Sequence, residues 1–354
     1  MGLSWPDILA RLTRREALTA SEAEETLGVV LAGDATPAQI GAFLTLLHAK
    51  GETADEVTGL ARAMVDAAVP CPLDVADGTV VVDLVGTGGD RLASFNVTTL
   101  AALIVAGSGV PVCKHGNRAA SSSVGTADVL EALGVAIEIG PQGVARCVTE
   151  AGMGFCFAQR FHPAMRFVGP VRKELGVPTV FNFLGPLTNP SRTRHQLVGV
   201  SDPSMAGIMA SVFGATGSAR AFIVHADDGL DELSVTSPSD VLEVRGDGTG
   251  GYELHEWRVD PTDLGLAQAT MADLRGGDAA FNAGVIRSVL GGEEGPRRDV
   301  GVLNAAAALV VAGRADDLAS GLAVARESVD SGRAEAVLDA LIATSQAALR
   351  QETG

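Results

Sequence analysis

Two short apolar runs, each followed directly by a glycine-containing turn, constrain the fold most. The first run covers residues 80–85 and precedes residues 86–90 (GTGGD); the second covers 110–113 and precedes residues 114–118 (KHGNR). Short β-branched runs bounded by glycine are typical of buried strands. Because glycine has no Cβ, such turns let the backbone approach a phosphate closely. Two strand-turn units side by side therefore predict one anion-binding pocket at the strand ends.

Neither turn matches a standard phosphate-binding fingerprint. The GTGGD turn lacks the third glycine of the dinucleotide pattern and the Gly-Lys-Ser/Thr ending of the P-loop. Asp90 beside a phosphate requires a hydroxyl-rich sugar or a bound cation to offset its charge. Either turn alone is equally consistent with an ordinary strand-to-helix loop. The occurrence of both in one short unit, the second carrying Lys114 and Arg118, favours a binding site.

The pattern of helices and strands divides the 354 residues into two parts. Residues 1–70 are expected to be helical, with capping-box starts at Ser21, Thr36 and Thr53. After a Pro-Cys-Pro break at 70–72, apolar runs alternate with helical segments, which predicts a mainly parallel sheet covered by helices. The expected strands lie at 80–85, 110–113, 136–139, 154–158, 196–199 and 221–225, followed by a hairpin of 241–244 and 252–257.

Residues 162–190 interrupt this alternation. Residues 162–176 read as one helix that begins near Pro163 and ends at Gly176, and a turn follows at 179–190. We expect this insertion to pack back on the N-terminal helices. The predicted fold is therefore α/β, with a small helical domain (1–70, joined by about 163–187) and a large α/β domain (73–162 and 188–354).

Charge and cysteine content narrow the function. The formal net charge is −17 and the pI is near 4.7, which argues against binding nucleic acid or anionic membranes through the overall field. Four cysteines without a C-x-x-C pair indicate reduced core thiols, as in a cytoplasmic protein. We expect neither a signal peptide nor a membrane span.

An acidic loop follows the expected strand at 221–225. It carries Asp227, Asp228, Asp231 and Glu232 around Gly229. A solvated acidic loop is the common alternative. However, ligands of open α/β sheets bind at the carboxyl ends of strands, and hard carboxylate oxygens suit Mg²⁺ held together with substrate phosphates.

Further motifs complete a recognisable set. They are HPAM at 162–165 with PVR at 170–172, FNFLGPLTNP at 181–190, and GLDE at 229–232. Together with GTGGD and KHGNR, and in this order, they resemble the anthranilate phosphoribosyltransferase family from about residue 5 to 345. The resemblance implies the two-domain fold given above and a homodimer formed through the helical domains. It also implies transfer of the phosphoribosyl group of phosphoribosyl pyrophosphate to the amine of anthranilate, in tryptophan biosynthesis, with Mg²⁺.

The resemblance also implies site residues. Phosphoribosyl pyrophosphate contacts fall on Gly86, Gly89, Asp90, Ser94, Asn96, Val97, Thr98, Thr99, Lys114, His115, Gly116, Asn117, Arg118, Ala119, Ala120, Ser121, Ser122 and Thr126. Metal positions fall on Thr98, Asp231 and Glu232. Anthranilate positions fall on Gly86, Asn117, Arg172, His115 and His162. No residue is assigned as a catalytic acid or base.

The sequence departs from the family pattern mainly at 91–94 (RLAS), where a glycine-rich stretch ending in threonine is usual. Three alternatives remain. A related pyrimidine nucleoside phosphorylase is disfavoured by the KHGNR block and Arg172. A non-catalytic nucleic-acid-binding relative is disfavoured by the acidic charge and by Asp231 and Glu232. A phosphoribosyltransferase for another aromatic amine stays open.

Overall fold

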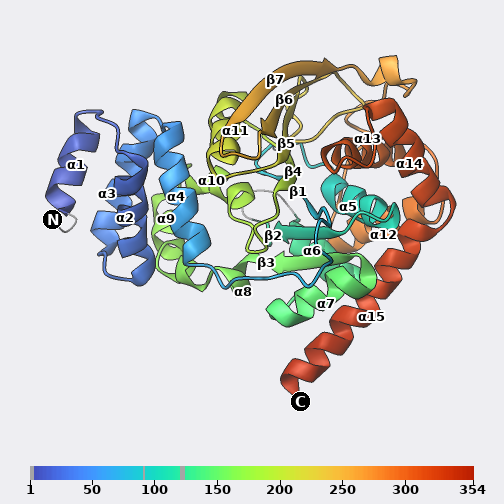
Figure 1. Ribbon diagram of the computed structural model, residues 1–354, viewed down its shortest axis with the longest axis horizontal. Helices are drawn as coiled ribbons and strands as arrows, with labels where there is room; N and C mark the ends of the chain where they lie inside the picture. The colour runs from blue at the N-terminus through green and yellow to red at the C-terminus, as the bar shows by residue number, and fades with distance from the viewer. Residues whose placement is uncertain (1–3, 91, 120–123) are drawn as a thin grey trace.

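The computed structural model describes residues 4–90, 92–119 and 124–354. A group of N-terminal helices stands at one end of the molecule, beside a larger part built around a sheet (Figure 1). The N-terminal helices are α1 (Trp5–Thr13), α2 (Ala20–Ala32), α3 (Pro37–Lys50) and α4 (Ala54–Asp66). No helix in the described part of the chain is long and apolar enough to cross a bilayer.

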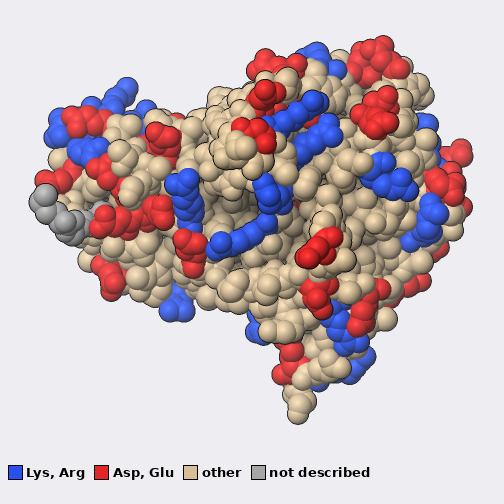
Figure 2. Space-filling view, viewed as in Figure 1, with Lys and Arg blue, Asp and Glu red and all other residues tan. Residues whose placement is uncertain are grey.

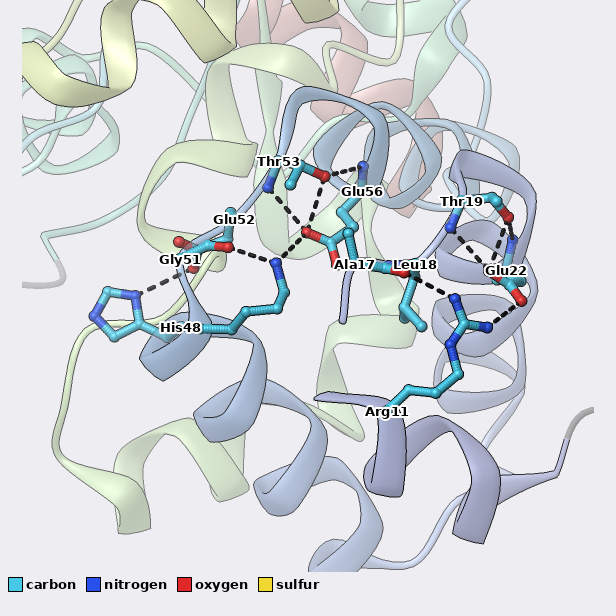
Figure 3. A network of polar contacts seen from close by, with 11 residues as sticks. Arg11, Ala17, Leu18, Thr19, Glu22, His48, Gly51, Glu52, Thr53 and Glu56 are labelled. Carbon is cyan, nitrogen blue, oxygen red and sulfur yellow. Dashed lines mark hydrogen bonds and ion pairs between the residues drawn. The ribbon is translucent and has the colours of Figure 1, made fainter. Parts of the chain in front are cut away.

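Capping boxes fix the starts of three of these helices. At α3 and α4 the side chains of Thr36 and Thr53 accept hydrogen bonds from backbone N–H groups three residues on, as predicted. At α2 the cap is Thr19 and not the expected Ser21. Glu22 explains the difference, because its carboxylate accepts a 2.8 Å bond from the Thr19 N–H and closes the box there (Figure 3).

A seven-stranded sheet forms the centre of the larger part, in the order β3-β2-β1-β4-β5-β6-β7. The first five strands run parallel, and β6 and β7 add an antiparallel hairpin at one edge. This confirms the predicted α/β class and the predicted hairpin. The strands are β1 (Val82–Gly86), β2 (Val112–Gly116), β3 (Met153–Phe157), β4 (His195–Gly199), β5 (Arg220–Ala226), β6 (Ser239–Gly246) and β7 (Tyr252–Val259).

Successive side chains along β4 and β5 lie alternately in two separate hydrophobic cores. Leu197 and Phe222 belong to the core shared with the C-terminal helices, whereas Val198 and Ile223 belong to the core shared with the N-terminal helices. This is the two-residue period of a strand buried on both faces. The other helices of at least seven residues are α5 (Val97–Gly107), α6 (Thr126–Leu133), α7 (Pro141–Ala151), α9 (Gly169–Leu175), α11 (Ala206–Ala215), α12 (Ala279–Leu290), α13 (Pro296–Val311), α14 (Leu318–Asp330) and α15 (Arg333–Thr353).

The expected single helix over 162–176 is wrong. A 3-10 turn at Pro163–Arg166 is separated from α9 (Gly169–Leu175). Pro170 gives the reason, since it has no N–H to continue a helix from the preceding turn and is tolerated in the first turn of a new one. The side chains of Val171 and Phe181 lie in the same core as the N-terminal helices.

The expected strand at 136–139 is also wrong. These residues are irregular, although Ile137 and Ile139 are buried. Side chains of α15 bind the backbone here: Ser345 accepts a bond from the Ala136 N–H, and Glu352 accepts one from the Gly140 N–H. With these amides occupied by a helix, an apolar run does not need a strand partner.

Candidate active site

The GTGGD and KHGNR segments lie at the carboxyl ends of two neighbouring strands of the sheet. GTGGD begins at Gly86, the last residue of β1, whereas the first three residues of KHGNR belong to β2, which ends at Gly116 and not at the expected residue 113. Because β1 and β2 are parallel neighbours, their carboxyl ends meet as the sequence predicts. The strand order reverses between β1 and β4, where Gly86 pairs with Gly199. Open α/β sheets bind ligands at such a switch point.

Close packing at this point requires both glycines. A Cβ on Gly86 would lie 2.4 Å from Oδ2 of Asp231, and a Cβ on Gly199 would lie 1.4 Å from the Asp231 carbonyl oxygen. The Gly88 N–H donates a 2.7 Å hydrogen bond to the same Asp231 carboxylate. The loop after β5 is thereby held against the GTGGD turn.

Three carboxylates meet here. Single oxygens of Asp90, Asp231 and Glu232 lie within 4.8 Å of one another. Burial, followed by the charge of Asp90, raises the pKa of Asp231 to about 6; burial and the charge of Asp231 raise the pKa of Glu232 well above its ordinary value. Oε2 of Glu232 is buried and has no partner among the described residues. Hard oxygens without enough protein donors fit a divalent cation such as Mg²⁺.

A buried lysine on β2 supplies positive charge near these carboxylates. Lys114 is 1% exposed, and its ammonium bonds to the carbonyl of Leu84 and to Oγ1 of Thr98, the latter at 3.2 Å. Burial lowers the pKa of Lys114 to about 8, while the charges of Asp83, Glu232 and Asp231 oppose that shift. Burial likewise raises the pKa of Asp83 to about 6.

Several positioning residues escape the sequence prediction. Asn189 donates to Asp83 Oδ2 and to the Cys113 carbonyl, both at 2.8 Å. Asn304 exchanges two bonds with the backbone of Leu233, at 3.0 and 2.8 Å, and so fixes the acidic loop. In the sequence, Asp83 could have been found as a charged residue inside an apolar run. The sequence of α13 gives no comparable signal for Asn304.

The start of α5 carries the next group of predicted residues. Asn96 is its N-cap, and Val97, Thr98 and Thr99 form its buried first turn. Asn282 of α12 donates a 3.0 Å bond to the Asn96 side chain and accepts a 2.8 Å bond from the Gly277 N–H. Ser94 pairs with Arg275 through an isolated bridge. The Val97 and Thr99 N–H groups already donate to the carbonyls of Phe95 and Asn96, at 2.7 and 3.1 Å. In this turn the Thr98 N–H is the amide without a partner among the described residues, and an amide at a helix N-terminus can bind an anion.

The predicted phosphoribosyl pyrophosphate contacts from Gly116 onward lie at the end of β2, in the segment after it and at the start of α6. Gly116 ends β2, and Asn117 accepts a 2.8 Å bond from the Arg118 N–H. The Arg118 guanidinium turns to α6, where it pairs with Asp128 at 2.9 Å and with Glu131. The Ala119 N–H bonds to Asp128, and Thr126 begins α6. The predicted contacts Ala120, Ser121 and Ser122, like Arg91, lie outside the described residues.

Two predicted acceptor-side histidines form a pair. The rings of His115 and His162 have centroids 5.0 Å apart, and each Nε2 is buried without a partner among the described residues. Burial lowers the pKa of His115 to about 3 and that of His162 to about 4, so both rings are neutral at pH 7. The carbonyl of Gly185 contacts Nδ1 of His115 at 3.2 Å.

Arg172 on α9 has neutral neighbours. Its Nη2 bonds to Oδ1 of Asn182 at 3.3 Å, and its guanidinium lies 5.3 Å from the Phe181 ring centroid. Several Lys and Arg side chains border the hollow between the helical and sheet parts (Figure 2). A guanidinium that is not already paired with a carboxylate can bind one through two hydrogen bonds.

Comparison with known proteins identifies the family. Residues 78–335 match the model of the glycosyl transferase family a/b domain, and residues 6–68 match that of its helical bundle domain. The anthranilate phosphoribosyltransferase of Chloroflexus aurantiacus is 49% identical over 341 residues, covering 96% of this chain and 98% of that protein. That of Salinispora arenicola is 50% identical, covering 97% of each. The chain belongs to the anthranilate phosphoribosyltransferase family.

Solved structures of anthranilate phosphoribosyltransferases share the fold. The enzyme of Thermus thermophilus superposes with a TM-score of 0.88 at 40% identity, covering 96% of this chain and 99% of that one. The Saccharomyces cerevisiae enzyme in complex with phosphoribosyl pyrophosphate and Mg superposes with a TM-score of 0.86 at 26% identity, covering 97% and 99%. This chain is thus a pentosyl-transferring enzyme of the family by both sequence and fold.

Proposed function

We propose that this chain transfers the phosphoribosyl group of phosphoribosyl pyrophosphate to the amine of anthranilate, in tryptophan biosynthesis. The products are N-(5-phosphoribosyl)anthranilate and pyrophosphate. The observation that carries the proposal is the meeting of the GTGGD turn, the start of α5 and three carboxylates at one switch point of the sheet. Relatives covering nearly the whole chain carry the same activity in their names.

The donor site is assigned to the β1 and β2 turns. Gly88 and Gly89 adopt φ values of +68° and +88°, a conformation that glycine takes without strain and that brings the Gly88 N–H onto the Asp231 carboxylate. The Thr98 N–H at the start of α5 would supply a further donor for a phosphate oxygen. Lys114 is buried and partly balances the carboxylates, so we assign it a positioning role and not a surface contact.

Asp90, Asp231 and Glu232 are the residues that would hold Mg²⁺. Their mutual repulsion and the unpartnered Glu232 oxygen fit a dication better than solvent alone. Bound there, Mg²⁺ would neutralise the charge that builds on pyrophosphate. Thr98 is a weaker candidate than the sequence suggests, because its hydroxyl already accepts a bond from Lys114.

The acceptor site is assigned to Arg172 and the His115–His162 pair. Arg172 would pair with the anthranilate carboxylate, and the two neutral rings would line the path of the aromatic ring. The pair comes from β2 and from the segment before α9, so the insertion would hold anthranilate near the carboxyl ends of the strands, where we place phosphoribosyl pyrophosphate. Holding the amine in line with the ribose carbon supplies much of the rate.

In the reaction the bond from ribose C1 to pyrophosphate breaks, its electron pair leaving with pyrophosphate. The amine lone pair forms the new C–N bond, and the nitrogen then loses a proton to water. The ribose carbon passes through an oxocarbenium-like state, as in glycoside cleavage. Donors already oriented toward the leaving group stabilise that state most. An aromatic amine is nucleophilic while neutral, so no strong base is required.

A fluorescence-depletion assay tests the proposal. The protein is mixed with anthranilate, phosphoribosyl pyrophosphate and Mg²⁺, and the loss of anthranilate fluorescence is followed. We expect rapid loss with the wild type, and a rate at least about 10²-fold lower with Arg172→Ala. Lys173→Ala is the matched control, because Lys173 is an exposed cation beside Arg172 on α9.

Other outcomes point to other functions. Donor binding by calorimetry without any loss of anthranilate would favour a different aromatic amine acceptor. Absence of donor binding would contradict the proposal and favour a non-catalytic relative.

We further propose a cytoplasmic homodimer that meets through the helical domain (1–70 with about 163–187), leaving 73–162 and 188–354 as the α/β domain. Separate family matches over residues 6–68 and 78–335 support the division, and four free buried thiols are consistent with a reducing compartment. Light scattering coupled to size exclusion tests the dimer. A mass near 36.0 kDa, that of one chain, would contradict it.

A further inference from the structure

Three of the four cysteines converge from segments far apart in the sequence. Cys71 lies in the linker after α4, Cys113 in β2 and Cys156 in β3. All three are buried, and their sulfur atoms lie within 4.8 Å of one another. A single buried cysteine packs as a small apolar side chain. Three buried cysteines whose sulfur atoms lie this close together can act as the ligands of one metal ion.

The sheet register makes a disulfide between the two strand cysteines unfavourable. Cys113 lies opposite Gly154, so Cys156 is two residues further along the neighbouring strand and on the same face. With strands about 4.8 Å apart and a rise of about 3.3 Å per residue, the Cα atoms of such diagonal neighbours are about 8 Å apart, which exceeds the roughly 7 Å limit for a disulfide. The sulfurs themselves are nevertheless 3.8 Å apart.

That sulfur separation matches ligation of a metal ion. With metal–sulfur bonds of about 2.3 Å, sulfurs are about 3.8 Å apart in a tetrahedral site and about 4.0 Å apart in a trigonal one. A single ion can therefore bridge sulfurs that cannot bond to one another. Small side-chain rotations suffice, because the strands already present both thiols on one face.

The sulfur ligands favour a soft metal ion. Among the described residues this cluster contains sulfur ligands only, whereas the other candidate cluster contains carboxylates only. Thiolates select Cu(I), Zn(II) or iron–sulfur clusters. Structural zinc sites are almost always closed by four ligands. Three thiols, with no fourth side-chain ligand among the described residues, suit trigonal Cu(I).

Cys71 is the entry to the cluster. It stands between Pro70 and Pro72, both exposed, in an irregular linker. Its N–H bonds to the carbonyl of Pro190 at 3.1 Å, and its thiol donates to the carbonyl of Pro141 at 3.8 Å.

We propose that Cys71, Cys113 and Cys156 bind one Cu(I) ion and so fasten the interdomain linker to β2 and β3. The thiol protons are released to solvent on binding, and no electron transfer is involved. This site is separate from the carboxylate cluster. The proposal therefore does not depend on the proposed function, and its test needs no activity measurement.

The test is a competition titration of the reduced full-length chain under nitrogen, with Cu(I) supplied as its coloured bicinchoninate complex. We expect the wild type to withdraw one equivalent of Cu(I), and Cys71→Ala to bind at least about tenfold more weakly. Cys147→Ala is the matched control, since Cys147 is equally buried but lies outside the cluster. It should bind as the wild type does.

A second measurement protects the test against misfolded variants. Cu(I) should raise the melting temperature of the wild type and of Cys147→Ala but not of Cys71→Ala, which changes the linker and leaves the strands of the sheet intact. Absence of uptake by the native wild type would overturn the proposal. So would uptake that survives Cys71→Ala, or uptake of Zn(II) in preference to Cu(I).

Discussion

Two buried glutamates in this chain have opposite surroundings. Glu56, on α4, accepts bonds from the Leu18 and Thr53 N–H groups at 2.9 Å and from the Lys50 ammonium at 2.8 Å (Figure 3). Glu232, in the loop after β5, has one oxygen without a partner among the described residues. The helical part thus satisfies its buried charge within the protein, and the sheet part leaves its charge unsatisfied.

The difference shows what each part is built for. An unpartnered buried polar group costs stability, so it persists only where something else uses it. The carboxylates at the switch point have raised pKa values because burial and mutual repulsion oppose their ionisation. A cation supplied with the substrate would relieve both. Substitutions of the two glutamates should therefore have opposite effects on activity and stability.

Glu232→Gln should lower the transfer rate by about 10²-fold or more, because one charge that would hold Mg²⁺ is lost. It should not lower the melting temperature, since the substitution also removes repulsion with Asp231. Steady-state kinetics and thermal melts measure both. Asp227→Asn, an exposed acid of the same loop, is the control and should behave as the wild type. A Glu232→Gln variant as active as the wild type would contradict the proposed difference between Glu232 and Glu56.

Glu56→Gln should have the reverse profile. Removing one partner of a buried pair leaves the Lys50 ammonium uncompensated, and we expect a loss of about 3 kcal/mol in the free energy of unfolding. The transfer rate per folded molecule should stay unchanged. Urea denaturation measures the first quantity, with the exposed Glu25→Gln as control. A stability equal to that of the wild type would show that this network is dispensable.

The pH dependence of stability should also separate the two parts. Burial raises the pKa of Asp83 to about 6, against about 3.9 in an unfolded chain. Its contribution is therefore complete below pH 4 and is lost as the pH rises through 6, by up to about 3 kcal/mol. Asp83→Asn should flatten the decline of stability between pH 4 and 7.

Glu22 in the helical part provides the control of opposite sign. Its hydrogen bond to Arg11 lowers its pKa to about 2, so its contribution is present above about pH 4.3 and is lost as the pH falls through 2. Glu22→Gln should leave the slope between pH 5 and 7 unchanged. If it alters that slope as much as Asp83→Asn does, the assignment to Asp83 is wrong.

Local sequence patterns predicted helix starts correctly where a single capping residue determines the backbone conformation. Thr36 and Thr53 began helices as expected. The pattern failed where a distant segment decided: α15 side chains bind the amides of residues 136 and 140, and no local signal reveals that. The same holds for the site. The GTGGD turn and the acidic loop were visible in the sequence, but their contact through Gly86, Gly199 and Asp231 depends on the strand order.

The smallest expected effect concerns backbone conformation beside the GTGGD turn. Ala93 has a φ of +53°, in the left-handed region that disfavours a Cβ by roughly 1–2 kcal/mol. Ala93→Gly removes that strain but adds freedom to the unfolded chain, which costs roughly 0.4–1 kcal/mol. We therefore expect a gain in unfolding free energy of between about 0 and about 1.6 kcal/mol, measured by urea denaturation.

Gly33 in the helical part is the reverse case, because a left-handed residue there is already glycine. Its φ is +86°, and a Cβ would lie 2.7 Å from the Phe167 ring, so Gly33→Ala should clearly destabilise the fold. Ala93 thus keeps strain in the turn beside the donor site, at a position where the family is usually glycine-rich. A loss of stability in Ala93→Gly would show that the bridge from Ser94 to Arg275 already offsets the strain of the left-handed turn.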